Sequence, residues 1–294
     1  MSKYLSVFFR TPNSIELLLR ASSVSLSPTA CAVTTYMLDA RQSPTGRLIL
    51  SLVVSMLSAF VGLVLVRCVA PASWLHANNE VAGNYLQTLG TIYAVLLAFV
   101  VFVVWQQHNE TRCAVEKEAN ELSDLYRIIK AMPGTQRVQD CIQSYGRIVV
   151  NEEWEAMARG SWSEKAEQAL EQIWQVLQEL EPPSGRDATL YSETLAKFND
   201  LSDSRSHRLY CSMLRLPPSL WLLLLTNGGL VIGSMWIFGL ESFSAHALMT
   251  VALAGSIGFI LFLVADLDNP FWGSWRVGPD AFHRALGHKA QRER

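Results

Sequence analysis

Four long apolar stretches constrain the fold of this chain more than any other feature of its sequence. A membrane-spanning helix needs about 20 apolar residues, because it rises about 1.5 Å per residue across a hydrocarbon core about 30 Å thick. Four uncharged stretches have close to this length: Leu48–Val66, Leu86–Trp105, Leu216–Leu240 and Ala247–Ala265. A soluble protein of 294 residues could not bury four such helices in one core. The sequence therefore predicts an integral membrane protein with four transmembrane helices in two pairs.

The basic residues indicate how these helices are oriented. The two short connections, one within each pair, contain a single basic residue, Arg67. All other Lys and Arg residues lie before the first pair, between the pairs or after the second pair. Because short cytoplasmic segments carry an excess of Lys and Arg, we expect both termini and the central segment in the cytoplasm. The expected location is the cell inner membrane, with several passes and the lipid bilayer as surroundings.

These observations divide the chain into five expected segments. They are a cytoplasmic N-terminal tail (1–46), a first transmembrane pair (47–106), a cytoplasmic helical bundle (107–215), a second transmembrane pair (216–266) and a cytoplasmic C-terminal tail (267–294). The N-terminal segment is rich in Ser, Thr and Pro, and two interpretations of it stay open. It is either a disordered tail or a segment upstream of a translation start at Met37.

The central segment has the sequence pattern of a helical bundle. Apolar residues recur at steps of three and four over 114–131, which is typical of a helix with one buried face. Pro and Gly residues after this helix, and again at 182–185, predict further helices near 135–158, 163–180 and 187–214. No alternating strand pattern occurs, so the expected fold class is all-α.

Two more properties of the central segment bear on its role. Nothing between Trp105 and Val115 would break a helix, so the second transmembrane helix is expected to continue directly into the bundle. The segment contains 18 acidic and 13 basic residues, which argues against nucleic acid as a partner.

Several separated motifs resemble the bestrophin-like bacterial membrane proteins of unknown function. They occur in the order Asn79–Gly83, Thr91–Phe99, Val115–Asn120, Glu153-Trp154 with Met157 and Gly160, Arg205 and Arg208, Pro217-Pro218 with Trp221, and Leu267–Phe271 with Gly273. More distantly, the chain is similar to bestrophins, which are pentameric anion channels with two pairs of membrane helices around a helical cytoplasmic region. The resemblance implies a homo-oligomer, a pentamer by analogy, that conducts ions.

The sequence departs from calcium-gated bestrophins after the last transmembrane helix. In those channels an Asn-Pro-Phe-Gly motif leads into an acidic run that binds calcium. Here Trp272 follows Asn269-Pro270-Phe271. The first carboxylate after it is Asp280, so no acidic run follows the motif. Calcium needs six to eight oxygen ligands, so gating by a site of that kind is not expected.

The second transmembrane stretch contains the candidate pore-lining residues. Small and polar residues recur on one face at helical spacing, and two aromatic residues follow them; the candidates are Thr88, Thr91, Ala94, Ala98, Phe99 and Phe102. Hydroxyls, backbone dipoles and a hydrophobic constriction could together select and gate ions. Close helix packing explains the small residues equally directly, and both roles are compatible in an oligomer.

Five polar residues near the membrane helices are candidate ion or interface residues: Glu80, Asn227, Asp266, Asp268 and Asn269. Glu80 either forms part of an acidic ring at an external mouth or stabilises the first turn of its helix. Asn227 precedes two glycines, which indicate either close packing or a hinge. Asp266 and Asp268 either cap the turn at Asn269-Pro270 or bind a cation or an arginine such as Arg205 or Arg208.

No pattern typical of an enzyme occurs. The six histidines are scattered, the five cysteines have no metal-binding spacing, and no Gly-rich phosphate loop is present, so no catalytic residue, metal or cofactor is expected. The leading function, which the resemblance to bestrophins implies, is a passive channel for ions with a preference for anions, lined by the second transmembrane helix. The alternative is a non-conducting scaffold or signalling component that acts through its cytoplasmic bundle.

Overall fold

The computed structural model describes residues 44–71, 75, 79–180 and 186–287, and these residues are helical apart from short connections. The expected N-terminal tail, with Met37, lies outside the described residues except for its last three positions. The helices are α3 (Pro44–Val69), α5 (Asn79–Lys130), α6 (Gln136–Ile148), the π-helical segment η1 (Val149–Glu153), α7 (Trp154–Ala158), α8 (Glu164–Gln178), α9 (Arg186–Met213), α10 (Pro218–Trp236), α11 (Phe243–Leu267) and α12 (Asp280–Gly287).

The all-α fold class and the four transmembrane helices are confirmed. Helices α3, α5, α10 and α11 each contain a stretch long and apolar enough to cross a membrane. Across the described residues there is no β-strand. The helices of the central segment begin and end within two residues of their expected positions, apart from the π-helical turn within the second of them.

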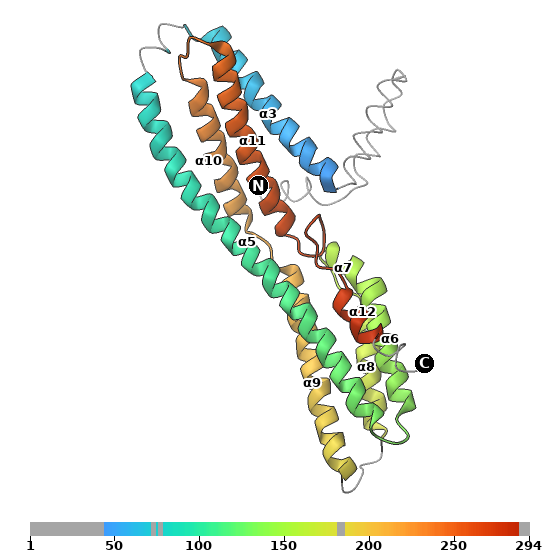
Figure 1. Ribbon diagram of the computed structural model, residues 1–294. Helices are drawn as coiled ribbons and strands as arrows, with labels where there is room; N and C mark the ends of the chain where they lie inside the picture. The colour runs from blue at the N-terminus through green and yellow to red at the C-terminus, as the bar shows by residue number, and fades with distance from the viewer. Residues whose placement is uncertain (1–43, 72–74, 76–78, 181–185, 288–294) are drawn as a thin grey trace, which may run out of the picture. The chain divides into compact units, whose positions relative to one another are not determined.

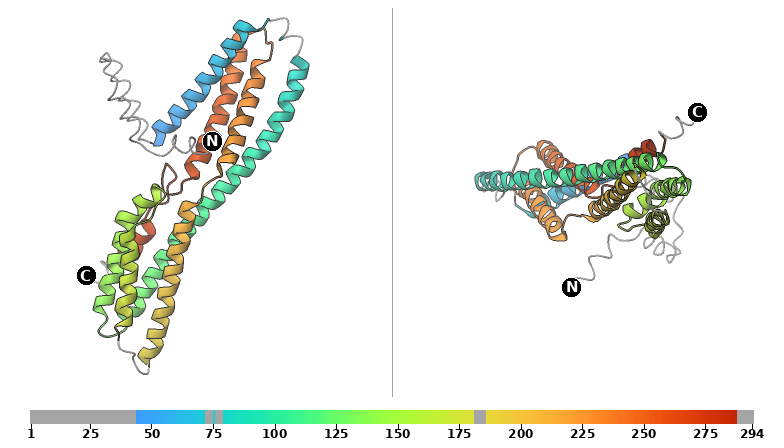
Figure 2. Two further views of the ribbon diagram at one scale, coloured as in Figure 1. Left: turned by 180° about the vertical axis from the view of Figure 1, so that it is seen from behind. Right: turned by 90° about the horizontal axis from the view of Figure 1, so that it is seen from below.

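Helix α5 runs without interruption for 52 residues, about 78 Å at the usual rise per residue. Its N-terminal half packs against α10 and α11, and its C-terminal half packs against α9, α6 and α12 (Figures 1 and 2). The expected continuation of the second transmembrane helix into the bundle is therefore confirmed. We define the helical bundle as the C-terminal half of α5 with α6–α9 and α12. Helix α5 therefore belongs to both the membrane helices and the helical bundle.

The membrane helices pack through apolar side chains and small residues. Tyr93, Leu97, Val100 and Val104, spaced four, three and four apart, form the buried face of α5, and residues of α10 and α11 complete this core. On α10, Gly228 lies against the Tyr93 ring, because a Cβ atom there would be 2.7 Å from the Tyr93 hydroxyl. Of the two glycines at 228–229, Gly228 therefore has a packing role, and α10 continues without a break through both.

Helix α3 is fixed against the second pair by its own small residues. Gly62 of α3 faces the Trp236 indole of α10 so closely that a Cβ atom would overlap the ring. The Trp236 Nε1–H donates a hydrogen bond to the Ala59 carbonyl at 3.0 Å, which holds the ring over the glycine. Small residues allow membrane helices to approach this closely.

The core of the helical bundle extends beyond the central segment. Its apolar cluster includes residues of α5, α6, α8 and α9, together with Phe271, Val277, Ala281, Phe282 and Ala285. Most of the described C-terminal segment, expected as a tail, therefore packs into the bundle. Helix α12 contributes one apolar face: its buried residues Ala281, Phe282 and Ala285 recur at steps of one and three.

Adjacent glycines of α10 provide a matched test of this packing. We expect Gly228→Ala to lower the thermal unfolding temperature of the detergent-purified protein by several degrees, because the added methyl group meets the Tyr93 hydroxyl and overpacking costs about 1–3 kcal/mol. Gly229→Ala should be neutral or slightly stabilising, since no atom lies within 4 Å of a Cβ there. Equal effects of the two changes would contradict the packing described for α10.

Candidate conduction face and buried charge cluster

The six candidate pore residues share one face of α5. Thr88, Thr91, Ala94, Ala98, Phe99 and Phe102 are all exposed in the single chain, whereas Tyr93, Leu97, Val100 and Val104 on the opposite face are buried. Because successive residues of an α-helix are 100° apart, these two sets cannot face the same neighbour. We call the exposed set, with the residues between them on that face, the conduction face, because the hypothesis from the sequence is that ions pass along it; no other described helix covers it.

The character of this face changes along the helix. Hydroxyl and amide side chains occur nearest its N-terminal end, at Gln87, Thr88 and Thr91. Large apolar side chains follow, with Val95, Phe99 and Phe102 between 61% and 67% exposed. Past the end of the apolar stretch the same face becomes charged, with exposed Arg112 and Lys117 beside half-buried Glu116 and Glu121. The order is therefore polar, apolar, then charged.

The threonine hydroxyls of this face are engaged by their own helix. Thr88 donates to the Asn84 carbonyl at 3.0 Å, and Thr91 donates to the Gln87 carbonyl at 2.8 Å. Each hydroxyl therefore turns its oxygen lone pairs outward. To donate to an anion, either hydroxyl would first have to leave its backbone partner, which limits what these residues contribute to anion binding.

Asn79 ties the N-terminus of α5 to the connection that follows α10. Its side-chain oxygen accepts a hydrogen bond from the Gly239 N–H at 2.8 Å, and its amide group donates to the Gly239 carbonyl at 3.3 Å. Glu80 follows in the first turn of the helix, where its exposed carboxylate complements the helix dipole. The geometry of the single chain is compatible with both interpretations of Glu80.

The remaining candidates near the membrane helices all bind backbone groups. Asn227 donates to the Leu223 carbonyl one turn earlier, at 2.9 Å. Asp268 accepts from the Leu216 N–H at 2.7 Å, and Asn269 donates to the Ala158 carbonyl at 3.2 Å. Asp266 accepts from two successive N–H groups, those of Ser274 at 2.8 Å and Trp275 at 3.2 Å.

These contacts hold the connections around α11 in place. Asp268 joins the start of α10 to the end of α11, and Asn269 joins the end of α11 to α7. Asp266 caps the backbone at Ser274 and Trp275 rather than the turn at Asn269-Pro270 considered for it. Its carboxylate lies where a Cβ atom on Gly273, which has a φ of 105°, would overlap it. The arginines considered as partners of the two aspartates bind other carboxylates instead.

A buried charge cluster lies at the centre of the helical bundle. Arg208 of α9 donates from Nε to Glu118 of α5 at 2.5 Å and from Nη2 to Glu153 of η1 at 2.6 Å. Arg205 donates to the other oxygen of Glu153 at 2.7 Å, and Tyr145 of α6 donates to Glu118 at 2.7 Å. Arg208 and both glutamates are fully buried, and Arg205 is nearly so. Two carboxylates and two guanidinium groups therefore balance each other.

Burial and charge act in opposite directions on this cluster. Burial disfavours a charged guanidinium, but Glu118 and Glu153 outweigh it, so the pKa of Arg208 is raised above its ordinary value. Burial, followed by the charge on Glu118, raises the pKa of Tyr145 well above the usual range. Arg208 therefore stays charged and Tyr145 stays a hydrogen-bond donor at every physiological pH.

Aromatic residues enclose the cluster. The Trp154 ring lies 5.6 Å from the Arg208 guanidinium and 5.6 Å from the rings of both Phe271 and Phe282, in edge-to-face geometry. Its Nε1–H donates to the Val277 carbonyl at 3.0 Å. The C-terminal segment is thus anchored directly beside the buried charges.

The cluster unites motifs that are far apart in the sequence. Glu118, Glu153-Trp154, Arg205 with Arg208, and Phe271 belong to four of the motifs that carry the family resemblance, and all of them meet here. In the sequence, Glu153 stands in the acidic run Glu152-Glu153-Trp154-Glu155, which by itself is typical of a solvated helix face. The π-helical turn at η1 was the missing information, since one extra residue in the turn rotates Glu153 and Trp154 toward the core.

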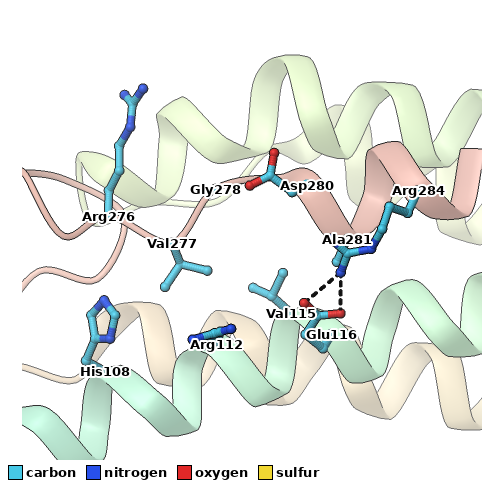
Figure 3. A pocket seen from close by; sticks show the side chains of 10 residues that line it. All are labelled: His108, Arg112, Val115, Glu116, Arg276, Val277, Gly278, Asp280, Ala281 and Arg284. Atoms are coloured by element: carbon cyan, nitrogen blue, oxygen red, sulfur yellow. Dashed lines mark hydrogen bonds and ion pairs between the residues drawn. The ribbon is translucent and has the colours of Figure 1, made fainter. Parts of the chain in front are cut away.

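One pocket, of about 280 Å³, lies between α5 and the segment that leads into α12 (Figure 3). Its charges are mixed: Arg112, Arg276 and Arg284 are opposed by Glu116 and Asp280. Arg284 already contacts both oxygens of Glu116 at 2.8 Å. The pocket therefore has no strong preference for ions of one sign.

Removing Arg208 should destabilise the bundle severely. We expect Arg208→Met to cost about 3–5 kcal/mol of stability, because it leaves Glu118 and Glu153 buried without a cation. Arg127→Met is the control, since its ion pair with Asp124 is exposed and worth less than about 1 kcal/mol. Thermal unfolding of the purified full chain measures the stability of both variants. If adding Glu118→Gln to Arg208→Met restores part of the lost stability, the buried unpaired charge is confirmed as the cause. Equal losses of stability in Arg208→Met and Arg127→Met would refute this explanation.

Comparisons with known proteins agree with this architecture. Residues 29–282 match the model of the Bestrophin-like domain family. Two point mutants of a bacterial bestrophin homologue from Klebsiella pneumoniae have a similar structure at 14% sequence identity. One has a TM-score of 0.60 over 83% of this chain and 99% of the homologue, and the other has a TM-score of 0.61 over 84% and 98%. No protein of curated function matches the sequence. The chain belongs to the Bestrophin-like domain family.

Proposed function

We propose that this protein is a passive ion channel in which several copies surround a conduction path with the conduction face of α5. The observation that carries the proposal is the shared position of the six candidate residues on a face of α5 that no other described helix covers. The structures of bacterial bestrophin homologues support the proposal, because their single chains have a similar arrangement of helices.

An oligomer is required by this proposal, because one helix face cannot enclose an aqueous path. A closed ring of identical copies places the same residues around a central axis. By analogy with bestrophins, five copies form the ring. The conduction face then meets water and its neighbours rather than lipid, which accounts for polar Gln87, Thr88 and Thr91 on an otherwise apolar stretch.

Conduction would be limited by the apolar middle of the face. A ring of Phe99 and Phe102 side chains forms a hydrophobic constriction, and such constrictions gate by excluding water. The edges of aromatic rings carry partial positive charge, which favours anions over cations. No Lys or Arg occurs in the apolar stretch, and both threonine hydroxyls donate to backbone carbonyls, so the preference for anions is expected to be modest.

The helical bundle would serve as the cytoplasmic part of the channel. The distribution of Lys and Arg supports a cytoplasmic bundle and cytoplasmic termini in the inner membrane. The buried charge cluster fixes the C-terminal half of α5, and because α5 is continuous, this is the same helix whose N-terminal half would line the path. The bundle then holds α5 at a constant angle to the axis.

Ion flux from liposomes tests this function. We expect chloride efflux through the purified protein, and we expect Thr91→Trp to abolish it by filling the path. Leu222→Trp is the matched control, since Leu222 of α10 is also exposed, at 64%, but lies away from the conduction face. Both variants must first elute as the same oligomer as the unmodified protein.

Three outcomes separate the alternatives. Chloride flux that is lost only in Thr91→Trp supports the proposal. Potassium flux in place of chloride flux would retain a channel but reject anion preference, and it would favour an acidic ring at Glu80. Absence of flux for both ions, at every voltage tried, would favour the non-conducting scaffold.

The aromatic constriction makes a separate prediction. Phe102→Ala should raise the chloride efflux rate several-fold, because a smaller side chain widens the path and admits water. Phe243→Ala is a control of equal size change, since Phe243 lies at the start of α11 and contacts the Phe60 ring. An unchanged or lower rate in Phe102→Ala would place the barrier elsewhere.

A further inference from the structure

Three potential metal-binding side chains converge between α5 and α9, away from the conduction face and the buried charge cluster. His207 Nε2 lies 3.5 Å from Glu110 Oε1 and 3.8 Å from Cys211 Sγ. All three donor atoms lie within 4.8 Å of one another. His207 and Cys211 are one turn apart on the same face of α9, and Glu110 approaches from α5.

Hydrogen bonding alone does not satisfy this group. Both the carboxylate of Glu110 and the thiol of Cys211 face the same ring nitrogen of His207. That nitrogen can donate to the carboxylate or accept from the thiol, but one atom cannot do both in one tautomer. A cation between the three atoms would use all of them at once as ligands.

The separations suit a tetrahedral transition-metal site. Metal–ligand bonds of about 2.0–2.3 Å place the ligand atoms of a tetrahedral zinc ion about 3.3–3.8 Å apart. The two separations from Nε2 fall in this range, and the third, between Glu110 Oε1 and Cys211 Sγ, is within 4.8 Å. Thiolate, imidazole and carboxylate are also the ligand types that zinc uses, whereas calcium and magnesium prefer oxygen alone.

Access to the group matches an open metal site. Cys211 is buried, while the side chains of Glu110 and His207 are 50% and 47% exposed. An ion could therefore enter from solvent, and water could occupy the fourth position. Glu110 lies five residues beyond Trp105, the end of the apolar stretch, so the group is outside the membrane-spanning part of α5.

We propose that Glu110, His207 and Cys211 bind a divalent transition-metal ion of the zinc type, which joins α5 to α9. The ion would add a link between the two helices that already share the Arg208–Glu118 pair. The site does not depend on ion conduction, and it would exist equally in a scaffold.

The thiol sets a limit on affinity. Burial, and then the charge on Glu110, raises the pKa of Cys211 to about 11. A metal ion must therefore displace a proton at neutral pH, and binding is expected to be weaker than in a site with several activated thiolates.

Cobalt binding tests the site directly, because a cobalt–thiolate bond gives a charge-transfer absorption band in the near ultraviolet. Tag-free full-length protein in detergent is titrated with Co²⁺, and we expect this band to saturate at one ion per chain. Zinc should then displace the cobalt and remove the band. Cys211→Ser should abolish the band, whereas Cys113→Ser, which removes an exposed cysteine of α5, should keep it.

Two further variants keep the test decisive if Cys211→Ser folds poorly. His207→Ala and Glu110→Gln alter half-exposed side chains, so their metal-free unfolding temperatures should match that of the unmodified protein. We expect His207→Ala to weaken cobalt binding by about tenfold or more, and zinc to raise the unfolding temperature of the unmodified protein only. A band that persists in Cys211→Ser, or no saturable band in the unmodified protein, would overturn the proposal.

Discussion

The pairing of Arg208 with Glu118 and Glu153 is the interaction on which the helical bundle depends. It joins α9, α5 and η1 at a point where none of the three side chains is exposed. Removing charges from water is expensive, and the cost is recovered only when every charge has well-placed partners. Arg205 and Tyr145 supply the remaining ones, and the aromatic rings of Trp154 and Phe282 close the site to water. The cluster therefore specifies which faces of α5 and α9 meet, and it fixes the C-terminal segment beside them.

Helix α5 carries the consequences of this arrangement from the bundle to the membrane helices. Its buried face changes partners along its length, from α10 and α11 to α9 and α12 (Figure 1). Its other face is covered by no described helix over the apolar stretch, where it changes from polar to aromatic. Farther along, the face becomes charged, and there Glu116 pairs with Arg284 of α12 and Glu121 pairs with Lys197 of α9. Hydrogen bonds hold α5 in both regions. Asn79 binds Gly239 at the N-terminus of the helix, and Glu118 binds Arg208 within the bundle.

Much of this fold could be predicted from the sequence, because long-range features follow from hydrophobicity and helix periodicity. The apolar stretches located all four membrane helices, and the absence of a helix breaker after Trp105 predicted the continuity of α5. Helix α8 was predicted near 163–180 from the Pro and Gly residues around it, and in the structure Ser163 caps it by accepting a hydrogen bond from the Ala166 N–H. The residues that share one face of α5 were also predictable, since small and polar residues recur there at helical spacing, whereas the exposure of that face was not.

The remaining features depend on contacts that one segment cannot reveal. The π-helical turn that directs Glu153 inward has no strong sequence signal, so Glu153 resembled a surface residue. The partners of Asp266 and Asp268 are backbone N–H groups that only the fold brings near. The approach of Glu110 to His207 and Cys211 likewise joins positions about a hundred residues apart.

The central claim is that the conduction face of α5 surrounds an axis shared by several copies. Electron cryomicroscopy of the protein assembled in lipid nanodiscs tests it most directly. The account predicts a symmetric ring in which Thr91 and Ala98 face an open central path and Phe102 narrows it. A map in which these residues contact lipid, or are buried in contacts between subunits without a central path, would contradict the account.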